Sequence, residues 1–361
     1  MKGPALHFSP SLRLPYRVFV ALSGLLLLSR CIESIDPVLG SGMQFLVIEG
    51  QITDDGATPY VRVMQSGDLN KDIRGTPIPV LDAEVSIIDD VGNEYCSDQT
   101  ENGVYSFSGL IGQVGRSYQS SVTYSERSYT SSWEELLPVN GIDEIKAISR
   151  PIDDLSADGN IVTRYVYDVM VTTDIPTEKK NTYFKWNISG IYQFTDVSFP
   201  FPFVCYVSND LNKNNVSVFG DPESSGQILE DHVIYNNYVN YHFGWDYCFV
   251  IEQRSITADA YRFWNQTQRI LEREGGLFED PPSLIQGNFL NAEDSSEPVF
   301  GFFSASSVHH DFLCLGAFTL QGVQELECYR NDFNQPALDP TCYCSEIPNA
   351  TLDRPYYFDS L

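Results

Sequence analysis

The strongest constraint on the fold is a series of short segments in which apolar and polar residues alternate. Segments 60–64, 83–88 and 118–124 alternate in this way, and turns containing Gly, Asn or Asp separate them. A period of two places the apolar side chains on one face of a strand. Short strands at such intervals are typical of a sandwich. We therefore expect residues 44–135 to form an N-terminal, Ig-like β-sandwich.

The remainder of the chain, 136–361, predicts a larger second β domain. Segments 164–172 and 183–192 also alternate. Continuous apolar runs, as expected for central strands, occupy 247–251, 299–305 and 312–320. The composition, with 21 Tyr and 22 Phe, agrees with a chain rich in strands. The expected fold class is therefore mainly β.

Segment 257–274 breaks the β pattern, because its apolar and small residues recur at helical spacing. Thr257 is a suitable N-cap, and a glycine pair follows the segment. We expect one α-helix inserted in the second domain, with Phe263, Trp264 and Leu271 packed on the sheet.

The charge balance excludes several classes of partner. The 361 residues include 22 Lys and Arg against 49 Asp and Glu, a net charge of −27. Nucleic acid binding needs a basic surface, and anionic lipid attracts basic segments. We therefore expect no nucleic acid partner and no electrostatic docking on a membrane.

The first residues have the pattern of a secretory signal. Lys2, Arg13 and Arg17 precede an unbroken apolar and small-residue run at 18–28. This run is too short to span a bilayer as a mature helix, but it suits an export signal.

The signal ends in Leu-Ser-Arg-Cys, which resembles a bacterial lipobox whose cysteine, Cys31, is acylated and becomes the new N-terminus. Arg30 departs from the small residue that usually precedes that cysteine, and an ordinary secretory signal is the alternative. We expect 1–30 to be a lipoprotein signal peptide and 31–43 to be a lipidated tether.

Cysteine spacing suggests disulfides, which are common in exported proteins. The eight cysteines are Cys31, Cys96, Cys205, Cys248, Cys314, Cys328, Cys342 and Cys344. We expect one bridge between Cys328 and either Cys342 or Cys344. Cys205 with Cys248 is a second expected pair.

Cys314 lies in an apolar segment and is expected to be a small buried hydrophobe. A zinc site would need cysteine pairs with a second pair or histidines. The single Cys342-Tyr343-Cys344 does not meet that requirement.

No segment predicts a catalytic or metal centre. Asp68, Asn70 and Asp72 alternate as calcium ligands do, but Ile73 replaces the required glycine and no glutamate closes the loop. We expect no cofactor, with a structural calcium ion as the alternative. His309-His310 is expected to lie at a turn or strand edge, with a metal or general-base role as the alternative. No nucleophile motif accompanies these residues.

Two aromatic segments are candidate recognition surfaces. The first, 235–245, mixes aromatic anchors with short amides, as adaptable recognition surfaces do. Its candidate binding residues are Tyr235, Tyr238, Tyr241, His242 and Trp245. The second, 199–203, alternates Phe with Pro, and its candidates are Phe201 and Phe203. The alternative for both segments is ordinary packing on a sheet.

Four groups of residues together resemble a family of Bacteroidota outer-membrane lipoproteins known as domain of unknown function 4249. These groups are 47–54, the helical segment followed by 275–282 and then Gly287-Asn288, 299–307, and Cys342-x-Cys344 with 355–358. Within 44–135, Gly50, Pro79-Val80, Ala83-Glu84-Val85 and Gly103-Val104-Tyr105 also resemble the carboxypeptidase-regulatory-like module, an interaction or spacer domain without catalytic residues. The family resemblance implies an accessory lipoprotein, often encoded beside TonB-dependent receptors, and carries over no catalytic residue.

We therefore expect a non-enzymatic protein, lipid-anchored in the outer membrane at the cell surface. It would be an accessory or lid-like subunit of a β-barrel complex, with a TonB-dependent transporter as its partner. The alternative is a stand-alone surface lipoprotein that binds a glycan or another ligand.

Overall fold

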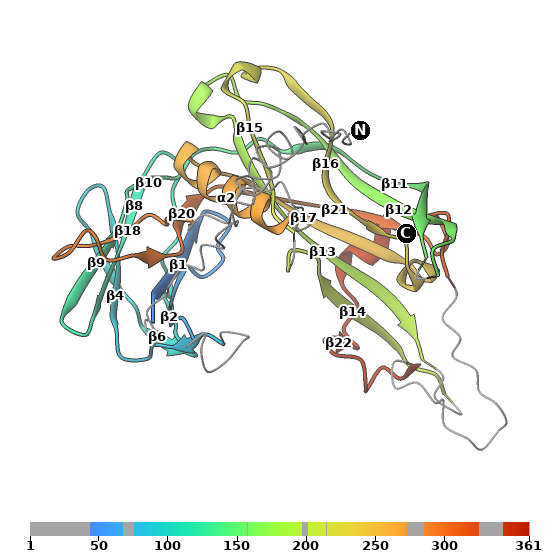
Figure 1. The fold of residues 1–361 in the computed structure, drawn as a ribbon, viewed down its shortest axis with the longest axis horizontal. Coiled ribbons are helices and arrows are strands. Elements are labelled where there is room, and N and C mark those ends of the chain that lie inside the picture. Colours follow the sequence, from blue (N-terminus) through green and yellow to red (C-terminus); the bar gives the residue numbers. More distant parts are fainter. Residues whose placement is uncertain are drawn as a thin grey trace, which may run out of the picture. The chain divides into compact units, whose positions relative to one another are not determined.

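The structure is a computed structural model that describes residues 44–360, apart from 68–75, 157, 197–200, 214, 273–284 and 325–341. The signal, Cys31, the tether, the Asp68–Asp72 loop and Cys328 lie outside the described residues. Strands dominate the described chain, and one α-helix accompanies them (Figure 1). The expected mainly β fold class is confirmed.

The first sandwich consists of two sheets. One has the order β19-β1-β2-β7-β6, with β3 paired to β2 and β20 paired to β1. Its strands are β1 (Leu46–Thr53), β2 (Tyr60–Gln65), β3 (Ile78–Pro79), β6 (Gln99–Glu101), β7 (Val104–Ser106), β19 (Val299–Phe300) and β20 (Phe303–Ser306). The other sheet has the order β18-β9-β8-β4-β5, with β10 paired to β8. Its strands are β4 (Glu84–Asp89), β5 (Glu94–Cys96), β8 (Ser117–Tyr124), β9 (Arg127–Ser131), β10 (Glu134–Glu135) and β18 (Phe289–Asn291).

Late residues complete the first sandwich. β1 pairs in parallel with β19 and β20, and β18 pairs antiparallel with β9. Phe289 and Phe303 are fully buried in the first core beside Ile48. The sequence placed 299–305 in the second domain, and the pairing instead puts it in a sheet of the first sandwich. An apolar run predicts a strand, but it does not reveal the edge with which that strand pairs.

The second sandwich also has two sheets. The smaller has the order β11-β12-β16 and the larger β21-β17-β13-β14-β22, with β15 paired to β13. The smaller consists of β11 (Ile142–Leu155), β12 (Ile161–Asp174) and β16 (Ile228–Tyr238). The larger consists of β13 (Tyr183–Thr195), β14 (Val204–Asp210), β15 (Ser217–Gly220), β17 (Tyr247–Ser255), β21 (Val308–Leu315) and β22 (Ala350–Thr351). Short 3₁₀ turns lie at η1 (Lys179–Asn181), η2 (Pro222–Ser224), η3 (Tyr241–Gly244) and η5 (Tyr356–Ser360).

Alternation along β13 builds the second core. Every second residue is buried, and Phe184, Trp186 and Phe194 pack among aromatic rings of β12 and β17. Gly190 is required at its position, because a Cβ there would lie 1.7 Å from the Tyr247 hydroxyl. The residues between the buried ones point away from this core, and those of β13 and β17 form the site described below.

The expected helix is α2 (Ala258–Leu271), and its N-cap is Thr257, whose hydroxyl accepts from the Ala260 amide. Phe263 and Trp264 pack with Phe302, but Leu271 is exposed. The expectation that Leu271 packs on the sheet is therefore wrong. It occupies the last turn of α2, whereas the packed residues Ala260, Phe263 and Trp264 lie in the first half of the helix. No helix among the described residues has both the length and the apolar character needed to cross a membrane.

A buried carboxyl lies at the start of α2. Glu134 is 1% exposed, and it accepts hydrogen bonds from Thr257, Ser132 and Asn288. Burial raises the pKa of Glu134 to about 7, although these hydrogen bonds oppose the shift. The group therefore joins β10, α2 and the segment before β18 around one titratable side chain.

The disulfides differ from those expected. Cys205 bonds to Cys344, and Cys248 bonds to Cys314. The expected Cys205–Cys248 pair is therefore wrong, Cys344 does not pair with Cys328, and Cys314 is not a free hydrophobe. The Cys248–Cys314 bond joins directly opposite residues of β17 and β21, a register that sequence spacing does not show.

Cys342 is also disulfide-bonded, so the expected Cys328–Cys342 pair stays a prediction, because Cys328 lies outside the described residues. Cys96 is a free, exposed thiol.

Candidate functional site

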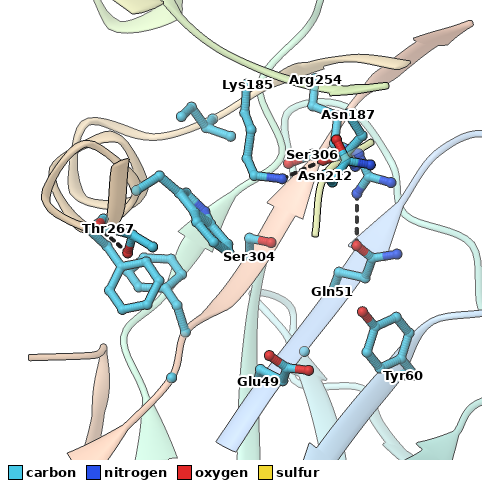
Figure 2. Close-up of a pocket in the computed structure, with 16 residues that line it drawn as sticks. Glu49, Gln51, Tyr60, Lys185, Asn187, Asn212, Arg254, Thr267, Ser304 and Ser306 are labelled. Atoms are coloured by element: carbon cyan, nitrogen blue, oxygen red, sulfur yellow. Dashed lines mark hydrogen bonds between the residues drawn. The ribbon is translucent and has the colours of Figure 1, made fainter. Parts of the chain in front are cut away.

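A cavity of about 370 Å³ lies where β1, β13, β17 and β20 meet α2 (Figure 2). Its charged residues are Glu49, Lys185 and Arg254, and its amides are Gln51, Asn187 and Asn212. Its hydroxyls are Tyr60, Thr267, Ser304 and Ser306. Its apolar wall is formed by Ile256, Phe263, Trp264 and Phe302. A mixed pocket of this size is typical of small-ligand sites.

The polar floor follows from strand alternation. On β13, Lys185 and Asn187 alternate with core residues such as Trp186. On β17, Glu252 and Arg254 alternate in the same way with residues that face the core. Because a strand's side chains point to opposite faces in turn, the core and the cavity floor are built from the same two strands.

Two cations face each other across this floor. Lys185 lies directly opposite Arg254 in the antiparallel register, and Asn187 lies opposite Glu252. Like charges in directly opposite positions destabilise a strand pair. Figure 2 shows both cationic side chains extending into the space between α2 and β1.

Arg254 is held in place by neighbouring acceptors. Its Nη2 and Nε donate to Glu252 Oε2 at 2.7 and 3.2 Å, and its Nη1 donates to Gln51 Oε1 at 2.8 Å. Burial opposes the ionised form of Glu252, but the charge of Arg254 and hydrogen bonds from Arg254 and Asn187 lower its pKa. The result is an ion pair on the floor that is anchored to the first sandwich through Gln51.

Lys185 has no such counter-ion. Its Nζ donates to Asn187 Oδ1 at 2.5 Å and lies 4.6 Å from the centre of the Trp264 ring. None of the ion pairs in the described part of the chain includes it. Burial and the charge of Arg254 lower the pKa of Lys185 to about 7, against a smaller opposing effect of Glu252. The side chain is therefore a partly desolvated cation that is ready to accept an anionic partner.

The β1 and β2 side of the cavity carries the remaining charge. The Glu49 carboxylate pairs with Arg62 at 2.5 Å, so its charge is largely compensated. Burial and the charge of Glu49 raise the pKa of Tyr60, which keeps the phenol protonated. The arrangement therefore combines cations, neutral hydrogen-bonding groups and an aromatic wall. No cluster of three metal-ligating side chains occurs in the described ranges.

Most of the candidate residues in segment 235–245 pack against other aromatic rings instead of lying free at the surface. Tyr235 is buried in the second core. His242 stacks on Tyr192 at 4.4 Å, and burial lowers the pKa of His242 to about 4. Trp245 lies edge-on to Phe194 at 4.9 Å, and Tyr241 contacts both His242 and Trp245.

Tyr238 is exposed and donates to Asp154. The residue is 44% exposed, and the Arg164 guanidinium lies over its ring at 5.7 Å. A binding role for the segment stays a prediction.

The 199–203 segment presents its described rings to solvent. Phe201 is 77% exposed and Phe203 is 55% exposed. The two lie in the connection between β13 and β14, at the base of which the Phe203 amide donates to Asp196. The paired histidines are at β21, on a strand edge as expected. His310 contacts Asp55 at 2.7 Å, and His309 lies close to Gly141.

Sequence reasoning did not select Lys185 and Arg254. The available signal was a lysine alternating with aromatic residues at 183–186, which places a cation on the face opposite the core. That face becomes a pocket wall only because α2 and β20 cover it, and neither contact is visible in the strand's own sequence.

Comparison with known families gives one result. The family model described as Domain of unknown function (DUF4249) matches residues 32–311. The match covers most of the chain, including the cavity. No curated protein matches the chain.

Proposed function

The chain belongs to the DUF4249 family, and from this premise we propose that it is a non-enzymatic lipoprotein of a Bacteroidota outer membrane. In this proposal, the protein is an accessory subunit of an outer-membrane β-barrel complex, such as a TonB-dependent transporter, at the cell surface. The lipid on Cys31 holds it close to its partner. A tether raises the local concentration of two partners, so a weak contact is sufficient.

One observation carries the proposal: an exposed apolar surface beside β14, which we call the Phe–Pro surface. It comprises Phe201, Phe203 and Leu352, of which Leu352 is 67% exposed. Phe203 and Leu352 line the same shallow groove of about 340 Å³. Grouped exposed apolar side chains, aromatic ones above all, are typical of protein contact sites.

The base of the Phe–Pro surface is anchored by hydrogen bonds and a disulfide. The Phe203 amide donates to Asp196 Oδ1 at 2.7 Å, and the Asp196 amide donates to the Phe203 carbonyl at 2.9 Å. The Cys205–Cys344 disulfide ties the segment that carries Leu352 to β14. A surface that is already ordered loses less conformational entropy on binding.

The test is co-purification from the native outer membrane in mild detergent, with mass spectrometry of the proteins that accompany a tagged chain. We expect a stoichiometric β-barrel partner with the natural sequence. Phe201→Ser with Phe203→Ser should lower its yield at least about tenfold, as loss of two anchor side chains commonly does.

Leu155→Ser with Ile161→Ser is the matched control, because these residues are 68% and 75% exposed on a different hairpin. That pair should leave the yield unchanged. A natural chain that purifies alone would remove the accessory role. Equal losses in both variants would remove the Phe–Pro surface as the contact.

A second candidate function is a stand-alone surface lipoprotein that binds a glycan or another small ligand. The cavity of Figure 2 favours it, since that cavity combines cations, amides and aromatic rings in one site. Purified protein that binds ligand without a membrane partner would support this candidate.

A further inference from the structure

We propose that the cavity of Figure 2 binds a small organic carboxylate, with its anionic group against Lys185 and Arg254 and its apolar body against Phe263, Trp264 and Phe302. This inference does not depend on the Phe–Pro surface or on a membrane partner. It concerns a different part of the molecule and is measured with purified protein.

Free donors are the first argument. A guanidinium has five N–H groups and an ammonium has three. Arg254 donates its Nε–H and one Nη2–H to Glu252, and one Nη1–H to Gln51. Lys185 donates one N–H to Asn187. Each cation therefore keeps two N–H groups with no acceptor among the described residues, and both cations line the same cavity.

Charge is the second argument. The two cations are directly opposite each other on β13 and β17, and one carboxylate, Glu252, compensates them on the floor. This local excess of positive charge is unusual in a chain with a net charge of −27. An anion between the two would convert a repulsive cross-strand pair into two charge-assisted hydrogen-bonding contacts.

The cavity walls identify the rest of the ligand. About 370 Å³ accommodates a small molecule rather than a chain segment. Phe263, Trp264 and Phe302 form an apolar side, and Phe263 contacts both other rings. Inorganic phosphate would leave this side in contact with water. An organic anion would bury it and gain the hydrophobic contribution as well.

Binding should also take up protons. The charged and titratable groups that face Lys185 are Arg254 and Glu252 from β17, Glu49 from β1 and Tyr60 from β2, while α2 presents the uncharged Trp264. Burial and Arg254 lower the pKa of Lys185 to about 7. A bound carboxylate favours the charged form, so it raises that pKa, and affinity should fall as pH rises above 7.

The experiment is isothermal titration calorimetry of the purified chain at pH 7. The probes are benzoate, indole-3-acetate and octanoate, each beside its neutral amide, together with inorganic phosphate. We expect saturable binding of at least one carboxylate, about tenfold or more tighter than its amide, as expected for a charged hydrogen-bonding group. Titration in two buffers of different ionisation enthalpy should show proton uptake at pH 8.

The variants distinguish the effect of losing a charge in the cavity from the effect of changing the net charge of the protein. Lys185→Met should weaken the carboxylate about tenfold or more and abolish proton uptake, and Lys185→Arg should restore much of the affinity. Lys179→Met removes the same charge from an exposed position on η1 and should change nothing. Far-ultraviolet circular dichroism confirms that each variant is folded.

Several results would overturn the proposal: no saturable binding of any carboxylate at millimolar concentration, equal binding of acid and amide, or equal losses in Lys179→Met and Lys185→Met. Tighter binding of phosphate than of every carboxylate would also overturn it, because the apolar wall would then have no part in recognition. The Phe201→Ser, Phe203→Ser variant should bind the carboxylate as tightly as the natural chain does. Failure of the accessory role and failure of this proposal can therefore be distinguished.

Discussion

The two sandwiches close their cores by different means. The first centres on aliphatic side chains of β1, β2 and β4, and it is completed by strands that follow β1 by about 250 positions. The second centres on aromatic rings of β12, β13 and β17, and two disulfides tie its larger sheet together or to the C-terminal segment. No disulfide is found in the described part of the first.

This difference teaches where a binding site can arise in such a chain. β20 pairs with β1 in the first sandwich, and Ser307 leads directly into β21 of the second. The segment shared by both sandwiches therefore also forms a wall of the cavity, through Ser304 and Ser306. The cavity forms where the first sandwich takes up β20, a strand that lies in the sequence between strands of the second sandwich.

The largest expected effect comes from producing the first sandwich without the late strands that complete it. A fragment of residues 44–135 lacks β18, β19 and β20, and with them Phe289 and Phe303, which are fully buried in the first core. We expect this fragment not to fold, with no cooperative transition in urea. A fusion that appends residues 285–306 through a flexible linker should recover a cooperative transition. A fragment 44–135 that folds alone would break the comparison.

An intermediate effect is expected from the second sandwich. Cys205→Ser with Cys344→Ser opens a loop of 139 positions and should lower the free energy of unfolding by about 3–5 kcal/mol. Cys96→Ser, at the free thiol of the first sandwich, should change it by less than about 0.5 kcal/mol. Urea unfolding of both variants checks this, and equal effects would contradict the contrast between the sandwiches.

The smallest effect concerns the junction at Glu134. Its pKa is about 7 in the folded protein, above the ordinary 4.5, so the folded state binds more protons than the unfolded state between these values. Stability therefore falls as pH rises from about 4.5 to 7 and stays lower above that range, by about 3 kcal/mol in total. Glu134→Gln should remove most of this fall. The free energy of unfolding of the variant should therefore rise relative to that of the natural chain between pH 5 and pH 8.

Urea unfolding at the two pH values measures the Glu134 effect. Glu135→Gln is the matched control, since its carboxylate is not buried and pairs with Lys180 on the surface. It should follow the natural chain within about 0.5 kcal/mol at both pH values. An identical pH dependence in Glu134→Gln and the natural chain would show that the buried Glu134 carboxyl does not cause the fall in stability.

Much of the local structure could be predicted from sequence. Alternation at 83–88 correctly identified Val85 and Ile87 as buried, and helical spacing with Thr257 as N-cap identified α2. These features depend on neighbours along the chain. The pairing of β1 with β19 and the Cys248–Cys314 bond depend on register between distant strands, about which a segment's own pattern carries no information.

The candidate site could be predicted only in part. Phe201 and Phe203 are exposed, as a recognition segment requires, whereas Trp245 and His242 pack on the second sandwich. Aromatic residues occur both on binding surfaces and in cores, so an aromatic-rich segment alone does not show whether its side chains are exposed or buried. Lys185 and Arg254 meet across two strands, and their partners in α2 and β1 come from other parts of the chain.

The parallel pairing of β1 with β19 and β20 also sets an order in time. The ribosome makes β1 about 250 residues before its partners, which corresponds to tens of seconds at ordinary rates of translation. During that interval one edge of β1 has no partner strand, and unpaired edges promote association between chains. The nascent protein therefore has a period of exposure that is set by the length of the intervening chain, and a holding chaperone would have most to protect in that period.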